Sequence, residues 1–210
     1  VAIVTAFVVV GFASAHHMES AGHWVTGMNN RVVWGVPHVF AVFLIVSASG
    51  ALNAASLASV FGRETYKPLS RLSALMAITL LVGGLTVLVL DLGRPDRLIV
   101  AMTHYNFRSI FAWNIFLYTG FIVVVVVYLW MMFEPRMNRF VGRLGTTAFA
   151  WRLILTTGTG SIFAFLAARE AFDSAVLAPM FIAMSLSFGT ALTLILSALI
   201  FSIRGDGLPT

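Results

Sequence analysis

The sequence predicts an all-α integral membrane protein with about six transmembrane helices. Sixty per cent of its 210 residues are hydrophobic and only 10% are charged, whereas a soluble domain carries roughly 25% charged residues. The mean hydropathy is +0.96. The apolar runs are continuous, without the alternation of a membrane β-barrel strand, and most approach the roughly 20 residues that a spanning helix needs. A helical bundle within a membrane is therefore expected.

Six apolar segments are the expected spanning helices. The first, 1–15, is short, and we interpret it as what remains of a clipped helix. The others run over residues 36–60, 72–90, 110–133, 151–168 and 178–203. The fifth segment is the most polar, because it contains three threonines and a serine. The sixth has Pro179 in its first turn, where a helix tolerates proline.

Composition excludes several classes of redox centre from this chain. There is no cysteine, so thiolate-held iron–sulfur clusters, zinc on cysteine ligands and disulfides are ruled out. The five histidines, His16, His17, His23, His38 and His104, all fall in the predicted loops or helix ends of one half of the membrane. A haem ladder needs histidine pairs at two depths, so none is expected. We attribute the net charge of +5 to arginines that flank the spans and expect no binding of nucleic acid.

The distribution of Lys and Arg predicts the orientation. The loops after the second and fourth helices, together with the C-terminal end, hold eight of them, and Arg152 is counted there. The remaining loops hold five. Because the richer side faces the cytoplasm, both termini are expected inside. The segment "VLDLGRPDR" is then expected on the outer side.

Polar residues gather on one arc of the second helix. At about 100° per residue, this arc carries His38, Ile45, Ser49, Asn53 and Ser56. Polar groups cost free energy in hydrocarbon unless they have partners, so the arc should face other helices or a wet cavity. The alternative is that Ser49 and Asn53 bond only to neighbouring backbone. For His38 the alternatives are proton exchange, since imidazole titrates near neutral pH, and simple solvation at the interface.

The stretch "VLDLGRPDR" places charges at the outer end of the third helix. Asp91 follows an apolar run directly, so we expect its carboxylate at the edge of the hydrocarbon, in a pocket or a proton relay. Arg94, Asp96 and Arg97 either join this site or form an Arg–Asp clamp at the helix end. His104, Tyr105 and Asn106, in the next loop, either cover the same pocket or form an interfacial belt with Tyr105 as its anchor.

Several motifs together resemble the NrfD/PsrC family of membrane subunits. They are "WGVPHVF", "SASGAL", "YKPLSRLSAL", "LDLGRPDRL" and "YNFRSIFAWNIFLY", and they cover about residues 30–130. The segment "GHWVTGMNNRVVWGVPHVFA" is most similar to the DsrP-type members, which belong to sulfite-reductase-linked Dsr complexes. The family often has a proline before the fourth helix, where this chain has "RSIFAW".

The resemblance implies a haem-free subunit that binds a quinone near the outer face, beside an extrinsic iron–sulfur protein. It places His38 at the quinone head group and makes Asp91 and Arg94 part of the family signature. Trp34 and Tyr105 would pack against the ring. After the clipped helix at 1–15, it also implies two regions: a four-helix bundle at 31–175 formed by the second to fifth helices, and the start of a second bundle at 176–210.

The favoured hypothesis is therefore a quinone- or quinol-handling membrane subunit of a respiratory oxidoreductase complex, in sulfur metabolism. His38 and Asp91 would handle the protons of menaquinone or ubiquinone, while electrons pass to or from the partner's cluster. Other subunits, such as a multihaem cytochrome c, would complete the complex in a bacterial cytoplasmic membrane. The alternatives are an ion-translocating subunit and a structural anchor for extrinsic redox subunits.

Overall fold

The computed structural model describes residues 2–32, 34–166, 170 and 172–204, and every regular element in these ranges is helical. The α-helices are α1 (Ala2–Ala21), α2 (Val36–Ala51), α3 (Asn53–Ser59), α4 (Lys67–Leu90), α5 (Leu98–Thr103), α6 (Ile110–Phe133), α7 (Asn138–Ala164) and α8 (Leu177–Arg204). Short 3-10 turns are η1 (His23–Thr26), η2 (Glu64–Tyr66), η3 (Pro95–Arg97) and η4 (Pro135–Met137). The predicted all-α class is confirmed.

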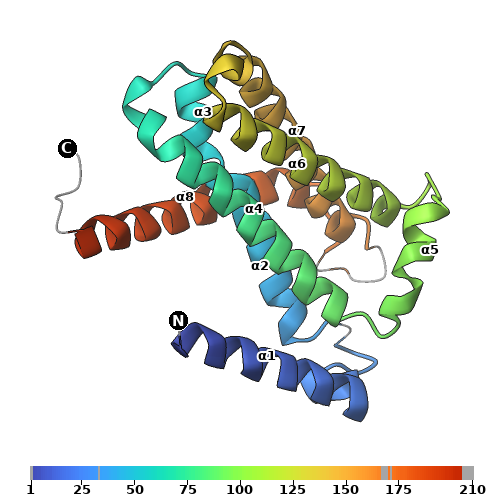
Figure 1. The fold of residues 1–210 in the computed structure, drawn as a ribbon. Coiled ribbons are helices and arrows are strands. Elements are labelled where there is room, and N and C mark those ends of the chain that lie inside the picture. The colour runs from blue at the N-terminus through green and yellow to red at the C-terminus, as the bar shows by residue number, and fades with distance from the viewer. Residues whose placement is uncertain (1, 33, 167–169, 171, 205–210) are drawn as a thin grey trace.

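Four spans form the expected bundle (Figure 1). The continuous pair α2–α3 packs against α4, α4 packs against α6, α6 packs against α7, and α7 returns to α2 and α3. The largest fully buried side chains include Leu52, Leu81, Phe121, Tyr128 and Leu155, one or more from each span. Large apolar side chains on the outer surfaces of α4, α6 and α8 are exposed, as expected for helices that face lipid.

The bundle has two ends, which we name after one residue each. At the His38 end, α2 and α6 begin and α4 and α7 end. At the Lys67 end, α3 and α6 end and α4 and α7 begin. These names describe the fold without assigning a side of the membrane.

The second predicted helix is interrupted at Leu52, which joins α2 to α3. The break lies beside the place where α8 crosses α2. A Cβ on Gly50 would overlap the backbone carbonyl of Ser185, and one on Gly189 would overlap the backbone of Gly50. Two glycines therefore let the two helix backbones approach within contact, as small residues do in membrane bundles.

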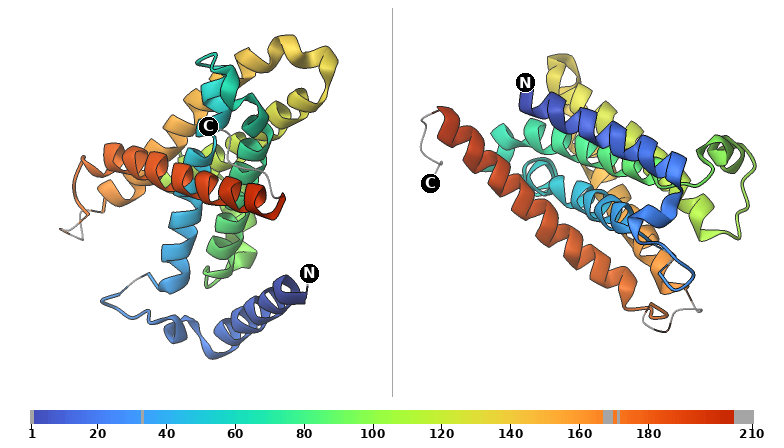
Figure 2. Two further views of the ribbon diagram at one scale, coloured as in Figure 1. Left: turned by 90° about the vertical axis from the view of Figure 1, so that its left-hand side faces the viewer. Right: turned by 90° about the horizontal axis from the view of Figure 1, so that it is seen from below.

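The sixth predicted helix exists as α8, and it packs along α2 and α7 of the four-helix bundle (Figures 1 and 2). Its first turns join a cluster in which Phe181 stacks on Phe163 of α7, with ring centroids 5.4 Å apart. A second bundle that begins at 176 stays a prediction. In this structure α8 is an integral neighbour of the first bundle.

The first helix extends beyond its predicted end at residue 15. It runs to Ala21, so the prediction that His16 and His17 lie in a loop is wrong. Its apolar side chains are almost all exposed, and it stands apart from the bundle near the His38 end (Figures 1 and 2). Its contacts are chiefly with η1.

The fifth predicted helix begins 13 residues earlier than expected, at Asn138 of α7. Arg139, Arg143 and Arg152 were assigned to a loop, and that prediction is wrong for all three. Because α7 carries these charges, its composition is less apolar than that of the other spans. In the described residues five helical segments are long and apolar enough to cross a membrane: α1, α2–α3, η2–α4, α6 and α8.

Candidate functional site

The two proton-handling candidates of the sequence meet at the His38 end. Nδ1 of His38 lies 3.4 Å from Oδ2 of Asp91, an ion-pair contact between the third residue of α2 and the residue that caps the C-terminus of α4. The two helices are antiparallel neighbours, so the start of one meets the end of the other. The His38 side chain is 21% exposed and the Asp91 side chain only 5%. The pair therefore lies at the rim of the buried region.

Trp34 orients the imidazole. Its ring stacks on that of His38 with a centroid distance of 5.4 Å and an angle of 9° between the planes. Trp34 is itself held edge-on by Phe163 of α7, at 5.1 Å, and by Phe172, at 5.7 Å. With one face of the imidazole on an indole and Nδ1 at a carboxylate, the orientation of the ring is fixed.

Two polar atoms of this pair have no partner in the described part of the chain. Oδ1 of Asp91 is buried without a hydrogen bond, and no described residue bonds to Nε2 of His38. Buried polar atoms in proteins are nearly always hydrogen-bonded, so an orphan carboxylate oxygen points to a missing donor. A quinol hydroxyl is one group with the required chemistry.

A cavity of about 890 Å³ lies next to the pair, between α1 and the ends of α2 and α4. Pro37 and Leu90, the chain neighbours of His38 and Asp91, contribute to its wall, together with His17 and Met18 of α1. His38 and Asp91 themselves are not among the residues that line it. The cavity falls in the range of about 300–1,000 Å³ that is typical of small-molecule sites.

The structure separates the other two predicted site residues from this pair. Arg94 is exposed and contacts Asp96, with Nε 3.3 Å from Oδ1, which is the clamp that was the alternative for this stretch. Tyr105 is 41% exposed and stacks on Phe107 with centroids 6.0 Å apart. Neither contacts His38. Their roles at a quinone stay predictions from the sequence.

Sequence reasoning missed a second polar constellation, centred on Arg152 of α7. Arg152 is 3% exposed, and its guanidinium lies over the ring of Phe149 at 4.8 Å. Its Nη1 donates to the carbonyl of Ser49, at 3.1 Å, and to Oδ1 of Asn53, at 2.6 Å. Asn53 in turn donates to the hydroxyl of Thr190 on α8, at 2.7 Å.

We call Ser49, Asn53, Arg152, Thr156 and Thr190 the Arg152 layer. The hydroxyls of Ser49 and Thr156 share a 2.6 Å hydrogen bond, so the layer joins α2, α3, α7 and α8. The polar arc of the second helix thus faces other helices, as expected, and Ser49 and Asn53 bond across the bundle. A sequence signal existed, because Arg152, Thr156 and Thr159 recur at helical spacing within the fifth apolar segment.

The polar residues of α6 also bond to α7. Asn114 donates to the carbonyl of Gly158 at 3.0 Å, and the hydroxyls of Tyr118 and Thr159 are 3.3 Å apart. Most other hydroxyls of α7 bond to the carbonyl four residues earlier in the same helix. Within the described residues no group of three or more His, Asp or Glu side chains is placed to hold a metal ion.

The comparisons with known proteins decide the family. The sequence profile described as "Polysulphide reductase, NrfD" matches residues 24–206. This chain belongs to the NrfD family. The expected family membership is thus confirmed, and the match extends well beyond the region in which the motifs were recognised.

Three relatives illustrate the range of NrfD-family proteins that this chain resembles. The Hdr-like menaquinol oxidoreductase integral membrane subunit of Archaeoglobus fulgidus is 33% identical over 97% of this chain and 49% of its own length. Protein NrfD of Escherichia coli is 27% identical over 89% of this chain and 63% of its own length. The menaquinone reductase integral membrane subunit of Nitratidesulfovibrio vulgaris is 26% identical over 64% of this chain and 32% of its own length.

The chain spans about half the length of several curated relatives that it matches, the Archaeoglobus fulgidus protein among them. No solved protein structure matches it. The specific similarity to DsrP-type members is not among the similarities found, so it stays a prediction within the confirmed family.

Proposed function

We propose that this NrfD-family chain is the quinone-binding membrane subunit of a respiratory oxidoreductase complex, with its proton-exchanging site at the His38 end. The observation that carries the proposal is the contact between His38 and Asp91, with its unpartnered Oδ1 and Nε2, beside a cavity of about 890 Å³. Relatives named as menaquinol oxidoreductase and menaquinone reductase membrane subunits support it. The quinone species, menaquinone or ubiquinone, is part of the proposal.

The side chains are arranged for base catalysis at a hydroxyl group. A bound quinol supplies two protons and two electrons when it is oxidised, and a quinone takes up the same number when it is reduced. Nε2 of His38 is the free nitrogen, so it accepts a hydroxyl proton. Nδ1 then carries its proton toward the Asp91 carboxylate, which stabilises the imidazolium, as a carboxylate does in other His–Asp pairs. Oδ1 of Asp91 accepts a hydrogen bond from a second hydroxyl or from a water molecule.

Electrons exchanged with the quinone have to pass to or from another subunit, because the sequence contains no cysteine to hold an iron–sulfur cluster. We propose an extrinsic iron–sulfur protein at the His38 end as the immediate electron partner, with a multihaem cytochrome c as a further subunit. Participation in sulfur metabolism belongs to the same proposal. In it, Trp34 holds the imidazole, and Arg94 and Tyr105 border the mouth of the site.

The basic residues suggest the orientation. The Lys67 end carries Arg63, Lys67, Arg71, Arg136, Arg139 and Arg143. The described part of the His38 end carries Arg31, Arg94, Arg97 and Arg108. By the positive-inside rule, we propose that the Lys67 end faces the cytoplasm of a bacterial cell and that the N-terminus of α1 is inside. The quinone site then lies near the periplasmic face.

The deciding experiment is the binding of a quinone analogue to the purified complex, with the native protein compared with His38→Ala. We expect at least a tenfold loss of affinity, equivalent to about 1.4 kcal/mol, with assembly unchanged. His104→Ala is the matched control, because among the described residues the side chain of this exposed histidine has a hydrogen bond only with Thr103, at 3.0 Å. Equal affinities of native protein and His38→Ala would overturn the site. Absence of binding by either protein would favour a structural anchor.

A further inference from the structure

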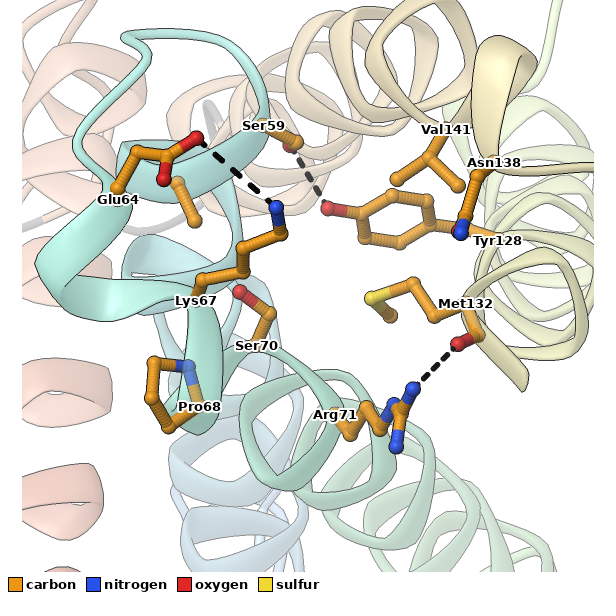
Figure 3. A pocket seen from close by; sticks show the side chains of 11 residues that line it. Ser59, Glu64, Lys67, Pro68, Ser70, Arg71, Tyr128, Met132, Asn138 and Val141 are labelled. Carbon is orange, nitrogen blue, oxygen red and sulfur yellow. Dashed lines mark hydrogen bonds and ion pairs between the residues drawn. The ribbon is translucent and has the colours of Figure 1, made fainter. Parts of the chain in front are cut away.

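A separate pocket of about 530 Å³ lies at the Lys67 end, far from the quinone candidate (Figure 3). Its walls come from the end of α3, the start of α4, the end of α6 and the start of α7. In Figure 3 the amino group of Lys67 and the hydroxyl of Tyr128 point toward the same space. Nothing in the proposed quinone chemistry uses these groups.

The pocket carries more positive than negative charge. Lys67 and Arg71 line it together with one acid, Glu64. The Lys67–Glu64 contact is long, at 3.9 Å, with side chains that are 74% and 85% exposed, so it neutralises little of the charge. Nη2 of Arg71 donates to the carbonyl of Met132 at 2.8 Å, and no described carboxylate lies within ion-pair distance of Arg71.

The dipoles of two long helices add to the positive potential of the pocket. Lys67 is the first residue of α4 and Asn138 is the first of α7, and both line the pocket. The N-terminus of a helix carries a partial positive charge, which favours an anion. The N–H of Lys67 itself donates to the carbonyl of Glu64, that of Asn138 donates to the carbonyl of Pro135, and Pro68 has no N–H, so the helices contribute their dipoles rather than these donors. The C-terminus of α6 has the opposite sign, but Arg71 already caps it through the Met132 carbonyl.

The rest of the lining is apolar or buried. Met132 and Tyr128 are 9% and 1% exposed, and Pro68 and Val141 complete this side. Tyr128 keeps its hydroxyl at the pocket through a 2.7 Å hydrogen bond to Ser59. A ligand that fits has an anionic head for the cations and an apolar body for this wall.

We propose that this pocket binds the head group of an anionic phospholipid. It lies where four helices of the bundle end, which is the depth of the lipid head groups. Basic pockets between transmembrane helices on the cytoplasmic side are suited to such head groups. The phosphate lies between Lys67 and Arg71 at the two helix N-termini, while the acyl chains lie along Met132 and Val141. The lipid thereby ties α4 to α7, two helices that contact each other little directly.

The test is a titration of delipidated complex in a non-ionic detergent with phosphatidylglycerol, followed by native mass spectrometry. Each cation near a membrane surface contributes about fivefold in affinity, so we expect Lys67→Gln with Arg71→Gln to weaken binding about 25-fold. The matched control is Arg139→Gln with Arg143→Gln, which removes the same charge from exposed positions of the same end outside the pocket. The control pair should lose less than about threefold.

Further measurements keep the result interpretable. Lys67→Gln alone alters a mostly exposed side chain and should still weaken binding about fivefold, even if the Arg71 change disturbs the fold. Lys67→Arg should retain binding. Equal weakening by both double variants, or equal affinity for phosphatidylcholine, would overturn the proposal. Competition by inorganic phosphate at the lipid's own concentration would instead identify a site for a small anion and would also overturn it.

Discussion

The His38 end and the Arg152 layer both place charged groups within an apolar bundle, and they differ in how those groups are satisfied. At the His38 end, a 3.4 Å contact leaves Oδ1 of Asp91 and Nε2 of His38 without partners among the described residues. In the Arg152 layer, hydrogen bonds as short as 2.6 Å join residues of α2, α3, α7 and α8. The His38 end retains unused hydrogen-bonding capacity next to a cavity. The Arg152 layer uses its hydrogen bonds to connect helices, although Nε of Arg152 is also buried without a partner among the described residues.

The difference separates a candidate reaction site from a structural cross-link. A proton can be exchanged only where a titratable group has a free position near a ligand site. Nε2 of His38 has no bond to a described residue, and a cavity lies next to its chain neighbour Pro37. Arg152 lacks a carboxylate partner among the described residues, and its charge is met by a carbonyl, an amide and an aromatic face. We therefore expect changes at the His38 end to alter quinone chemistry and changes in the layer to alter stability.

The largest expected effect is on turnover, from His38→Gln. Positioned general acid–base catalysis contributes typically 10²–10⁴-fold, so quinol-dependent electron transfer should fall by about that range. Steady-state quinol oxidation by the purified complex measures it, with the melting temperature as a check on the fold. His104→Gln should stay within about twofold of the native rate. A melting temperature that falls together with the rate would indicate a structural role for His38.

The next effect is on stability, from Gly50→Ala or Gly189→Ala. Each added Cβ would overlap backbone of the crossing helix, and backbone cannot move aside as a side chain can. We expect a loss of about 3 kcal/mol, at the upper end of overpacking effects, and detachment of α8 from α2. Thermal unfolding in detergent measures the loss. Gly83→Ala is the control, because its Cβ would meet only a side-chain carbon of Leu44, at 4.0 Å.

Asp91→Asn tests the carboxylate while preserving its shape. The amide cannot stabilise an imidazolium at His38, so we expect quinol turnover to fall between about tenfold and a hundredfold. Stability should change little, because one carboxylate oxygen has no described partner to lose. Asp96→Asn is the control, since Asp96 is exposed and contacts Arg94. Equal rates for Asp91→Asn and native protein would remove Asp91 from the mechanism.

Asn53→Ala tests the structural role of the Arg152 layer. It removes an acceptor from the buried guanidinium of Arg152 and a donor from Thr190. Hydrogen bonds to charged groups are worth about 1.5–3 kcal/mol, so we expect a loss of about 2 kcal/mol in the free energy of unfolding. Asn53→Asp keeps an acceptor for Arg152 and should lose less. Quinone affinity should be unchanged in both variants.

The smallest expected effect comes from Arg94→Gln. The side chain is 66% exposed and contacts Asp96, so affinity for a quinone analogue should fall less than about threefold. Isothermal binding measurements on the purified complex test this. A loss as large as that of His38→Ala would show that Arg94 reaches the bound ring, as the sequence hypothesis holds.

The helix bounds that could be predicted from the sequence were those marked by a continuous apolar run. The helices α2, α4, α6 and α8 were predicted because each carries apolar side chains along nearly its whole length, and such a run is visible in the sequence. The start of α7 was missed by 13 residues because arginines such as Arg139 and Arg143 are typical of loops between spans. The backbone hydrogen bonds of a helix form within the helix itself, so a helix can continue through a polar segment. For the same reason α1 continues through His16 and His17.

The sequence by itself determined the membrane class, the family, the absence of thiolate-held metal centres and the candidacy of His38 and Asp91. Only the tertiary structure decided that these two side chains meet with Trp34 while Arg94 and Tyr105 lie elsewhere, and that Arg152 is buried in a polar layer shared with α2–α3 and α8. Hydropathy and family motifs are local properties of the sequence, so they can be read without knowing how the chain folds. Contacts between side chains far apart in the sequence, such as His38 and Asp91, depend on how the helices pack against one another. Where α2 and α8 cross, for example, Gly50 and Gly189 determine how closely the two backbones approach.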